Sequence, residues 1–214
     1  MSRRQLPICG IFACLILVVP MSAVAGDPLP KDPNNIYGLF ANGFSYIIRE
    51  HRNPPDRIAL FLHIKSDALN ETPKQNGLAH FLEHMAFNGS KNFPPGELIP
   101  YMSKMGMRFG ADSNAHTSYE ETVYKLFMPD TKEETIDKAM TILQDYADGL
   151  LLLEAEIDKE RKVILEEARA RKSAMERIQK QMMKSVSAGS RIAIHDVIGD
   201  EKQIAETSWM AIRV

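Results

Sequence analysis

Cysteine is nearly absent from this chain of 214 residues, and its two cysteines, Cys9 and Cys14, both lie within the first 25 residues. Residues 26–214 therefore offer no disulfide and no thiolate ligand, which excludes zinc sites built on cysteine. A metal ion in this part of the chain must be held by histidine and carboxylate groups. Three such ligands are the pattern of a catalytic zinc site, in which the fourth position is left for water.

Strong charge of either sign is also lacking. The net charge is −2, and no basic block or basic segment interleaved with aromatic residues occurs, so the sequence predicts no nucleic-acid partner. The hydrophobic content of 44% and the charged content of 25% are typical of a globular protein. The length suits one domain of ordinary size.

A long apolar run occurs near the N-terminus, at residues 8–20 (ICGIFACLILVVP). Arg3 and Arg4 precede it and Ala23-Val24-Ala25 follows it, which together predict a secretory signal peptide over residues 1–25. An uncleaved membrane anchor is the alternative, which the shortness of the run disfavours. We therefore expect an exported protein, periplasmic or secreted, with no membrane contact beyond this segment.

After the signal peptide, turn-forming residues separate short apolar segments. Residues 26–41 are expected to form an N-terminal linker, followed by a domain over residues 42–214. Residues 44–48 and 58–64 are expected to be two strands joined by a turn that contains proline, and residues 122–128 a further strand. Hydrophobic spacing predicts the helices, which are expected over 77–87, over 97–105, after Asp130-Thr131, and over about 155–186.

The helix expected over residues 77–87 carries the pattern His-x-x-Glu-His at His80, Glu83 and His84. Residues three and four apart share one face of a helix, so the three side chains project together. Two imidazoles at this spacing can bind one zinc ion, and the carboxylate between them can take a proton from water that the metal activates. The alternative is two histidines in an ordinary helix. A buried helix with these polar groups is costly unless they are paired or bind a metal.

The last expected helix directs carboxylates toward the core. At about 100° per residue, Glu167 lies about 20° from Glu160, inside an apolar stripe, whereas Glu166 lies about 120° away. The stripe consists of Ile157, Val163, Ile164, Ala174, Met175 and Ile178. Carboxylates that point inward are rare unless they are paired or bind a metal, and Glu167 would supply what the two histidines lack. Pairing with a cation such as Arg171 is the alternative.

Three separated blocks resemble the pitrilysin/insulinase family of zinc metallopeptidases. They are residues 77–89, residues 110–124, and residues 160–167, and they occur in the order found in the family. The resemblance runs from about Asn42 to Ile204. It implies an α+β fold in which a mixed sheet and helices pack in two layers.

The resemblance also implies a role for each matching residue. His80, His84 and Glu167 would bind one Zn²⁺ per chain, Glu83 would be the general base, and Glu160 would be a helper glutamate. A further segment would belong to an edge strand that pairs with an extended peptide substrate; it contains Asn114, Ala115, His116 and Thr117. These roles imply a zinc metalloendopeptidase that hydrolyses peptides or small unfolded proteins.

The sequence departs from the family pattern in several places. Ser66-Asp67 stands where Gly-Ser is usual, and an insertion is expected around residues 148–156. The family's first domain would continue past Val214, and a later domain would supply an arginine and a tyrosine that bind substrate. We therefore expect a domain that is incomplete at its C-terminus, with a second domain or subunit completing the active site. The alternative is a truncated or non-catalytic fragment that binds zinc or peptide.

Overall fold

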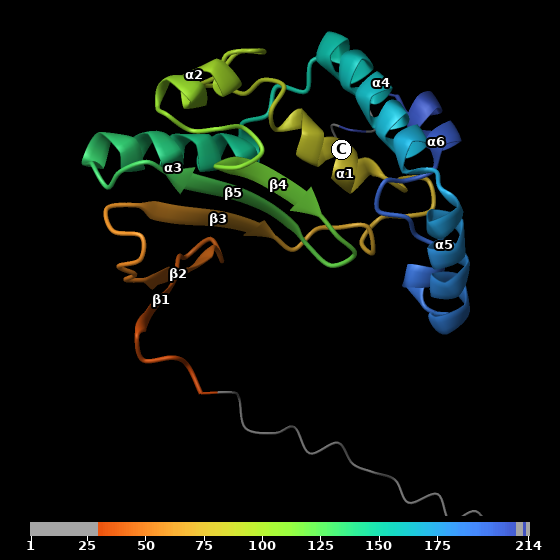
Figure 1. Ribbon diagram of the computed structural model, residues 1–214, viewed down its shortest axis with the longest axis horizontal. Coiled ribbons are helices and arrows are strands. Elements are labelled where there is room, and N and C mark those ends of the chain that lie inside the picture. The colour runs from red at the N-terminus through yellow and green to blue at the C-terminus, as the bar shows by residue number, and fades with distance from the viewer. Residues whose placement is uncertain (1–29, 209–211, 213–214) are drawn as a thin grey trace, which may run out of the picture. The chain divides into compact units, whose positions relative to one another are not determined.

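The computed structural model describes residues 30–208 and 212 (Figure 1). The signal peptide expected over residues 1–25 lies outside the described residues. The chain divides into two compact units, one ending at Glu50 and the other beginning at His51. Within residues 30–208 and 212, no helix is long and apolar enough to cross a membrane.

The first unit contains an antiparallel hairpin of β1 (Asn35–Leu39) and β2 (Ser45–Arg49). Its turn is closed by a hydrogen bond of 2.8 Å from the Phe40 N–H to the Phe44 carbonyl. Two expectations change here: β1 lies within the segment expected to be a linker, and β2 pairs with β1 instead of the strand over residues 58–64. The reason is the short loop with Gly43 at φ 87°, which is a stronger hairpin signal than the longer segment with two prolines.

The second unit is built around a three-stranded antiparallel sheet in the order β3-β5-β4. Its strands are β3 (Ile58–Ile64), β4 (Ser113–Thr117) and β5 (Thr122–Met128). The apolar strand β5 lies in the centre, where Leu126 and Met128 are fully buried. The polar strand β4 lies at an edge of the sheet. The expected α+β class is confirmed.

Two helices cover the sheet. α2 (Leu98–Lys104) and α3 (Glu133–Asp148) supply Met102, Ile142 and Tyr146 to the same core as the inner face of β5. Figure 1 shows α3 alongside the strands and α1 (Leu78–Met85) above β4. The helix that carries the His-x-x-Glu-His pattern is therefore held next to the edge strand.

A second core joins α1 to α4 (Glu154–Arg171) and α6 (Glu201–Glu206). Its buried members are Phe81, Met85, Ile157, Ile164, Ala168, Ile198, Ile204 and Ile212. Because Ile157 and Ile164 face α1, the residues beside them on α4 also face α1. This packing brings the carboxylates of α4 to the histidines of α1.

Two helices occur where one was expected over about residues 155–186. α4 ends at Arg171, Lys172 and Ser173 are extended, and α5 (Ala174–Val186) follows. The break has a local cause, because the Ser173 hydroxyl accepts a hydrogen bond of 3.0 Å from the Glu176 N–H and caps α5. A serine that can cap a new helix therefore outweighs the continuous apolar spacing.

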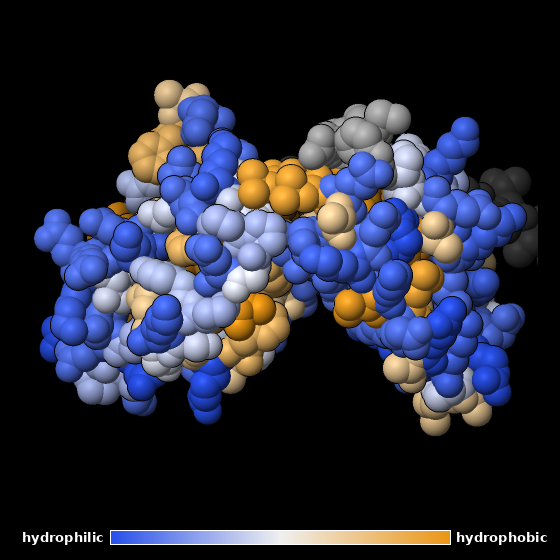
Figure 2. Space-filling view, turned by 90° about the horizontal axis from the view of Figure 1, so that it is seen from above, coloured by the Kyte–Doolittle hydropathy of each residue, from blue (hydrophilic) through white to orange (hydrophobic). Residues whose placement is uncertain are grey.

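Of the expected apolar stripe, only Ile157 and Ile164 on α4 are buried. Met175 and Ile178 on α5 are each 61% exposed, and Val163 on α4 is 51% exposed. Apolar residues also reach the surface elsewhere among the hydrophilic ones (Figure 2). The short 3-10 helix η1 (Arg191–Ala193) lies after α5 and leads to the segment before α6.

Candidate metal centre

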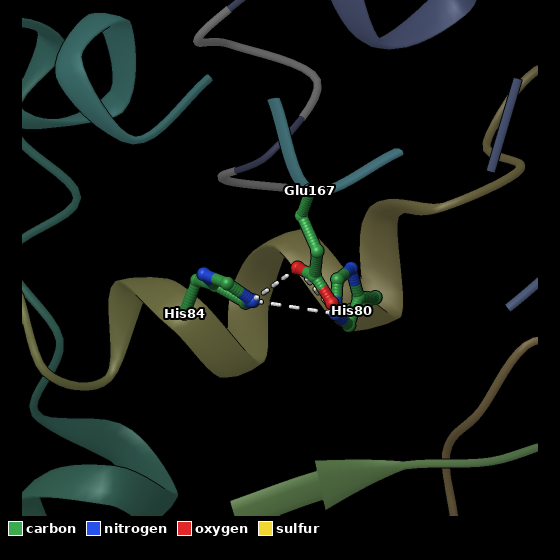
Figure 3. Close-up of side chains that lie close together, drawn as sticks. All are labelled: His80, His84 and Glu167. Carbon is green, nitrogen blue, oxygen red and sulfur yellow. Dashed lines mark hydrogen bonds and ion pairs between the residues drawn. The ribbon is translucent and has the colours of Figure 1, made fainter. Parts of the chain in front are cut away.

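α1 places His80 and His84 one turn apart, and α4 brings Glu167 against both of them (Figure 3). The Nε2 atoms of the two histidines are 3.3 Å apart. Oε2 of Glu167 lies 3.7 Å from Nε2 of His80 and 3.5 Å from Nε2 of His84. Three potential ligand atoms from two helices thus converge on one point.

The spacing of these atoms fits a zinc ion. Two ligands of a tetrahedral zinc ion, with Zn–N bonds of about 2.0–2.1 Å, are separated by about 3.3–3.4 Å. The two Nε2 atoms match this separation, and the carboxylate oxygen is only slightly farther from each. Two histidines and one glutamate are also a donor set of catalytic zinc sites.

Glu167 and its neighbour Glu166 differ as the helical spacing predicted. The side chain of Glu167 is 28% exposed and faces the histidines, whereas that of Glu166 is 69% exposed and pairs with Arg169. The other carboxylate oxygen of Glu167 contacts Arg171. The ion pair considered as an alternative is therefore present, and it leaves Oε2 directed at the histidines.

The two histidines sit in different electrostatic surroundings. Burial lowers the pKa of His80 to about 4, and the nearby charge of His84 acts in the same direction. Burial also acts to lower the pKa of His84, but the hydrogen bond to Glu160 and the charges of Glu160, Glu83 and Glu167 together outweigh it and raise that pKa above its ordinary value. Around neutral pH, His80 is therefore uncharged and has a lone pair to offer to a metal.

Glu160 holds the ring of His84 from the side opposite to the convergence point. Its Oε1 lies 2.7 Å from Nδ1 of His84, and its Oε2 accepts a hydrogen bond of 2.6 Å from the side-chain amide of Asn88. Burial acts to raise the pKa of Glu160, but these two hydrogen bonds together with the nearby charge of His84 outweigh it and lower that pKa. The carboxylate thus stays charged, as suits a partner of a histidine that binds a metal.

Asn88 is a residue of this site that sequence reasoning missed, because Asn88-Gly89 was expected only to end the helix. The amide also donates to the carbonyl of His84, at 3.3 Å. Asn88 lies beyond the end of α1 at Met85, so helical spacing in the sequence does not reveal its contact with Glu160.

Glu83 lies between the histidines in the sequence and is 9% exposed. Burial raises the pKa of its carboxyl group, and a hydrogen bond of 2.7 Å from the hydroxyl of Thr117 partly opposes this rise. Thr117 comes from β4, so the edge strand contacts the acidic residue of the motif directly. Sequence reasoning assigned Thr117 only to substrate binding and did not predict this contact.

The four residues expected to bind substrate lie on β4. Asn114 donates to the carbonyl of Gly110, and His116 contacts Glu121 at 3.4 Å. His63 on β3 also pairs with Glu121, at 2.9 Å.

Comparisons with known proteins show the family of the chain. The profile of the insulinase family (peptidase family M16) matches residues 46–194. The chain is 37% identical over 87% of its length to a protein of Haemophilus influenzae named probable zinc protease PqqL, and 33% identical over 95% of its length to an Arabidopsis thaliana protein named zinc protease PQQL-like.

A solved structure is similar as well. The crystal structure of the periplasmic protease PqqL from Escherichia coli matches 86% of this chain with a TM-score of 0.83 and 36% identity. The match covers 20% of that structure, 20% of the Haemophilus protein and 21% of the Arabidopsis protein. The chain therefore spans about one fifth of the length of these relatives.

Proposed function

Because the chain belongs to the insulinase family (peptidase family M16), we propose that it is the zinc-binding part of a metalloendopeptidase acting on peptides or small unfolded proteins. The observation that carries this proposal is the convergence of one oxygen and two nitrogen atoms from His80, His84 and Glu167. The names of the relatives as zinc proteases support the same metal.

His80, His84 and Glu167 would hold one zinc ion per chain. When bound, zinc supplies a Lewis acid that polarises the scissile carbonyl and lowers the pKa of water toward about 7. Glu83 would accept the proton of the attacking water on its carboxylate and then pass it to the leaving amine. Burial suits this exchange, because a raised pKa brings the carboxyl group closer to the working pH.

Glu160 and Asn88 would support the histidines. The Glu160 carboxylate accepts the Nδ1 proton of His84 and so fixes the ring with Nε2 free, and Asn88 holds the other carboxylate oxygen. Thr117 would keep the Glu83 carboxylate in place through its hydroxyl.

The substrate would pair with the free edge of β4. In the described part of the chain, β4 pairs with β5 on one side, and on the other it ends the sheet order, with only an isolated bridge between Ser113 and Phe109. An extended peptide can add a strand to such an edge through backbone hydrogen bonds, which place little demand on its sequence. The contact between Thr117 and Glu83 would bring a peptide bound there close to the general base.

A second domain or subunit would complete the active site. Stabilisation of the oxyanion is often the largest catalytic contribution, and among the residues described here we assign no group to it. The match covers only about one fifth of the relatives, so the missing group can come from such a region. The E. coli relative is periplasmic, which, with the signal-peptide pattern of residues 1–25, supports export to the periplasm.

The test combines metal analysis with a cleavage assay on the purified protein. We expect close to one zinc per chain, loss of the metal on chelation, and cleavage of an unfolded protein that stops with the chelator and returns with added zinc. A zinc content near zero would refute the site. Zinc binding without cleavage would favour the alternative, a non-catalytic fragment that binds zinc and peptide. This alternative is tested because the chain matches only part of the length of its relatives.

A further inference from the structure

The N-terminus of α1 is capped by a residue that lies well before it in the chain. The carboxylate of Glu71 accepts hydrogen bonds from the Gly77 N–H at 2.8 Å and from the Ala79 N–H at 2.7 Å. The Leu78 N–H between them donates to the Gln75 carbonyl. Gly77 itself contributes no side chain, so Glu71 takes the place of a local cap.

Glu71 is built into the protein. It is only 6% exposed, and its carbonyl accepts a hydrogen bond of 2.6 Å from Arg191 and lies 2.9 Å from Nε2 of His195. The Nδ1 atom of His195 lies 2.8 Å from the Arg191 carbonyl, so this buried ring bridges two backbone groups. The segment that contains η1 is thereby fastened to the loop before α1.

Two glycines bring the same segment against the start of the helix. Gly77 has φ 96° and Gly199 has φ 89°. A Cβ atom on Gly77 would lie 2.7 Å from the Gly199 Cα, and one on Gly199 would lie 2.6 Å from the Gly77 Cα. Only glycine at both positions permits this close approach, and it fixes where α1 begins.

The position of α1 matters most for His80. His84 has Glu160 on its Nδ1, whereas the buried Nδ1 of His80 has no hydrogen-bond partner among the described residues. Among the described residues, no side-chain hydrogen bond therefore holds the His80 ring from behind. Its direction depends on the backbone of the first turn, and His80 directly follows Ala79, whose N–H is bound to Glu71.

From these contacts we infer that Glu71 is a positioning residue of the metal centre, which sets the approach of His80 to the metal by holding the first turn of α1. This inference rests on the proposed function, because it takes His80, His84 and Glu167 to bind zinc. Glu71 would fix the direction of His80 through the backbone of α1, whereas Glu160 fixes the ring of His84 through a hydrogen bond with Nδ1.

The test measures metal binding and geometry in the full chain. Glu71→Gln keeps the size of the side chain but leaves one oxygen to accept two N–H groups. We expect its zinc affinity, measured by competition with a chromophoric chelator, to fall about 10-fold to 100-fold, as is typical when support of a ligand is lost. The visible absorption of the cobalt(II)-substituted protein should also change in shape or intensity, which a loss of stability alone would not cause.

Asp145→Asn is the matched control. Asp145 is 2% exposed, and its carboxylate holds the backbone N–H of Asn92 at 3.0 Å and the hydroxyl of Ser90 at 2.6 Å, so it too is a buried acid that fastens a loop. We expect this variant to lose stability but to keep its zinc affinity within about twofold, since it lies outside the metal centre and its support.

The outcomes separate the two proposals. Wild-type protein without zinc would refute the metal site itself. Wild-type affinity and an unchanged cobalt spectrum in folded Glu71→Gln would refute the positioning role alone. If Glu71→Gln fails to fold, Glu71→Asp decides, because it keeps the charge but is shorter by one methylene group. An intermediate affinity would support the role, and a wild-type affinity and spectrum would overturn it.

Discussion

Nδ1 of His84 lies 2.7 Å from a carboxylate oxygen of Glu160, a residue 76 positions later in the chain. This contact determines which nitrogen of the histidine can bind a metal. When Nδ1–H donates to the carboxylate, the Nε2 atom keeps its lone pair, and Nε2 is the atom that faces His80 and Glu167.

Loss of Glu160 should therefore weaken zinc binding without removing a ligand. We expect Glu160→Ala to lower the zinc affinity by about 10-fold to 100-fold in competition with a chelator. Glu156→Ala is a matched control on the same helix, since the two side chains are 15% and 16% exposed and Glu156 pairs with Lys159 instead. An equal loss in both variants would contradict a specific role of Glu160.

Replacement of a zinc ligand should reduce the zinc content more than replacement of a residue that only holds a ligand in place. We expect Glu167→Ala to reduce the zinc content of the purified protein far more than Glu166→Ala does, because only Glu167 faces the histidines. Metal analysis after dialysis against a weak chelator measures the difference. If Glu166→Ala loses more zinc, the assignment of the third ligand is wrong.

The acidic residues of α4 illustrate how far the sequence predicts the structure. The 100° spacing distinguished Glu167 from Glu166, and the distinction holds because both lie on one unbroken helix with Ile157 and Ile164. The same spacing gave a wrong prediction beyond Arg171, because hydrophobic spacing does not show that Ser173 caps a new helix. Local hydrogen bonds ended a pattern that hydrophobicity alone would have continued.

The sequence did not predict the contacts between residues that lie far apart in the chain. The sequence predicts that His80, Glu83 and His84 share a face, but it does not show that Thr117 donates to Glu83 or that Asn88 holds Glu160. The first contact needs the position of the edge strand next to α1. The second needs the packing of α1 on α4, which depends on the apolar residues of both helices.

Zinc affinity should fall as the pH falls, and His84 should set the range. In the metal-free protein the pKa of His84 is raised by its hydrogen bond to Glu160, against the effect of burial, whereas the pKa of His80 is about 4. Above the pKa of His84, both Nε2 atoms are free and the affinity is at its full value. Below it, one proton competes with zinc, and the dissociation constant should rise about tenfold per pH unit.

A second proton should begin to compete only near pH 4, where His80 is protonated. Competition titrations from pH 8 to pH 5 measure the dependence. In Glu160→Ala the decline should begin at a lower pH, because the hydrogen bond that raises the pKa of His84 is gone. An affinity that stays constant through this range would show that no proton is displaced from His84.

Removal of the general base should separate metal binding from catalysis. Glu83→Gln keeps an oxygen that can accept the hydrogen bond from Thr117, so we expect the fold and the zinc content to be retained. It cannot accept a proton from water, so cleavage of a fluorogenic peptide should fall by about 10²-fold to 10⁴-fold, the range typical of general acid–base catalysis. The assay requires a preparation in which the wild-type protein cleaves the peptide.

Glu120→Gln is the control, because Glu120 is an exposed carboxylate beyond the end of β4, and this variant should keep both zinc and cleavage. Undiminished cleavage in a zinc-loaded Glu83→Gln protein would rule out Glu83 as the base, and a matching loss of zinc would make it a structural residue instead.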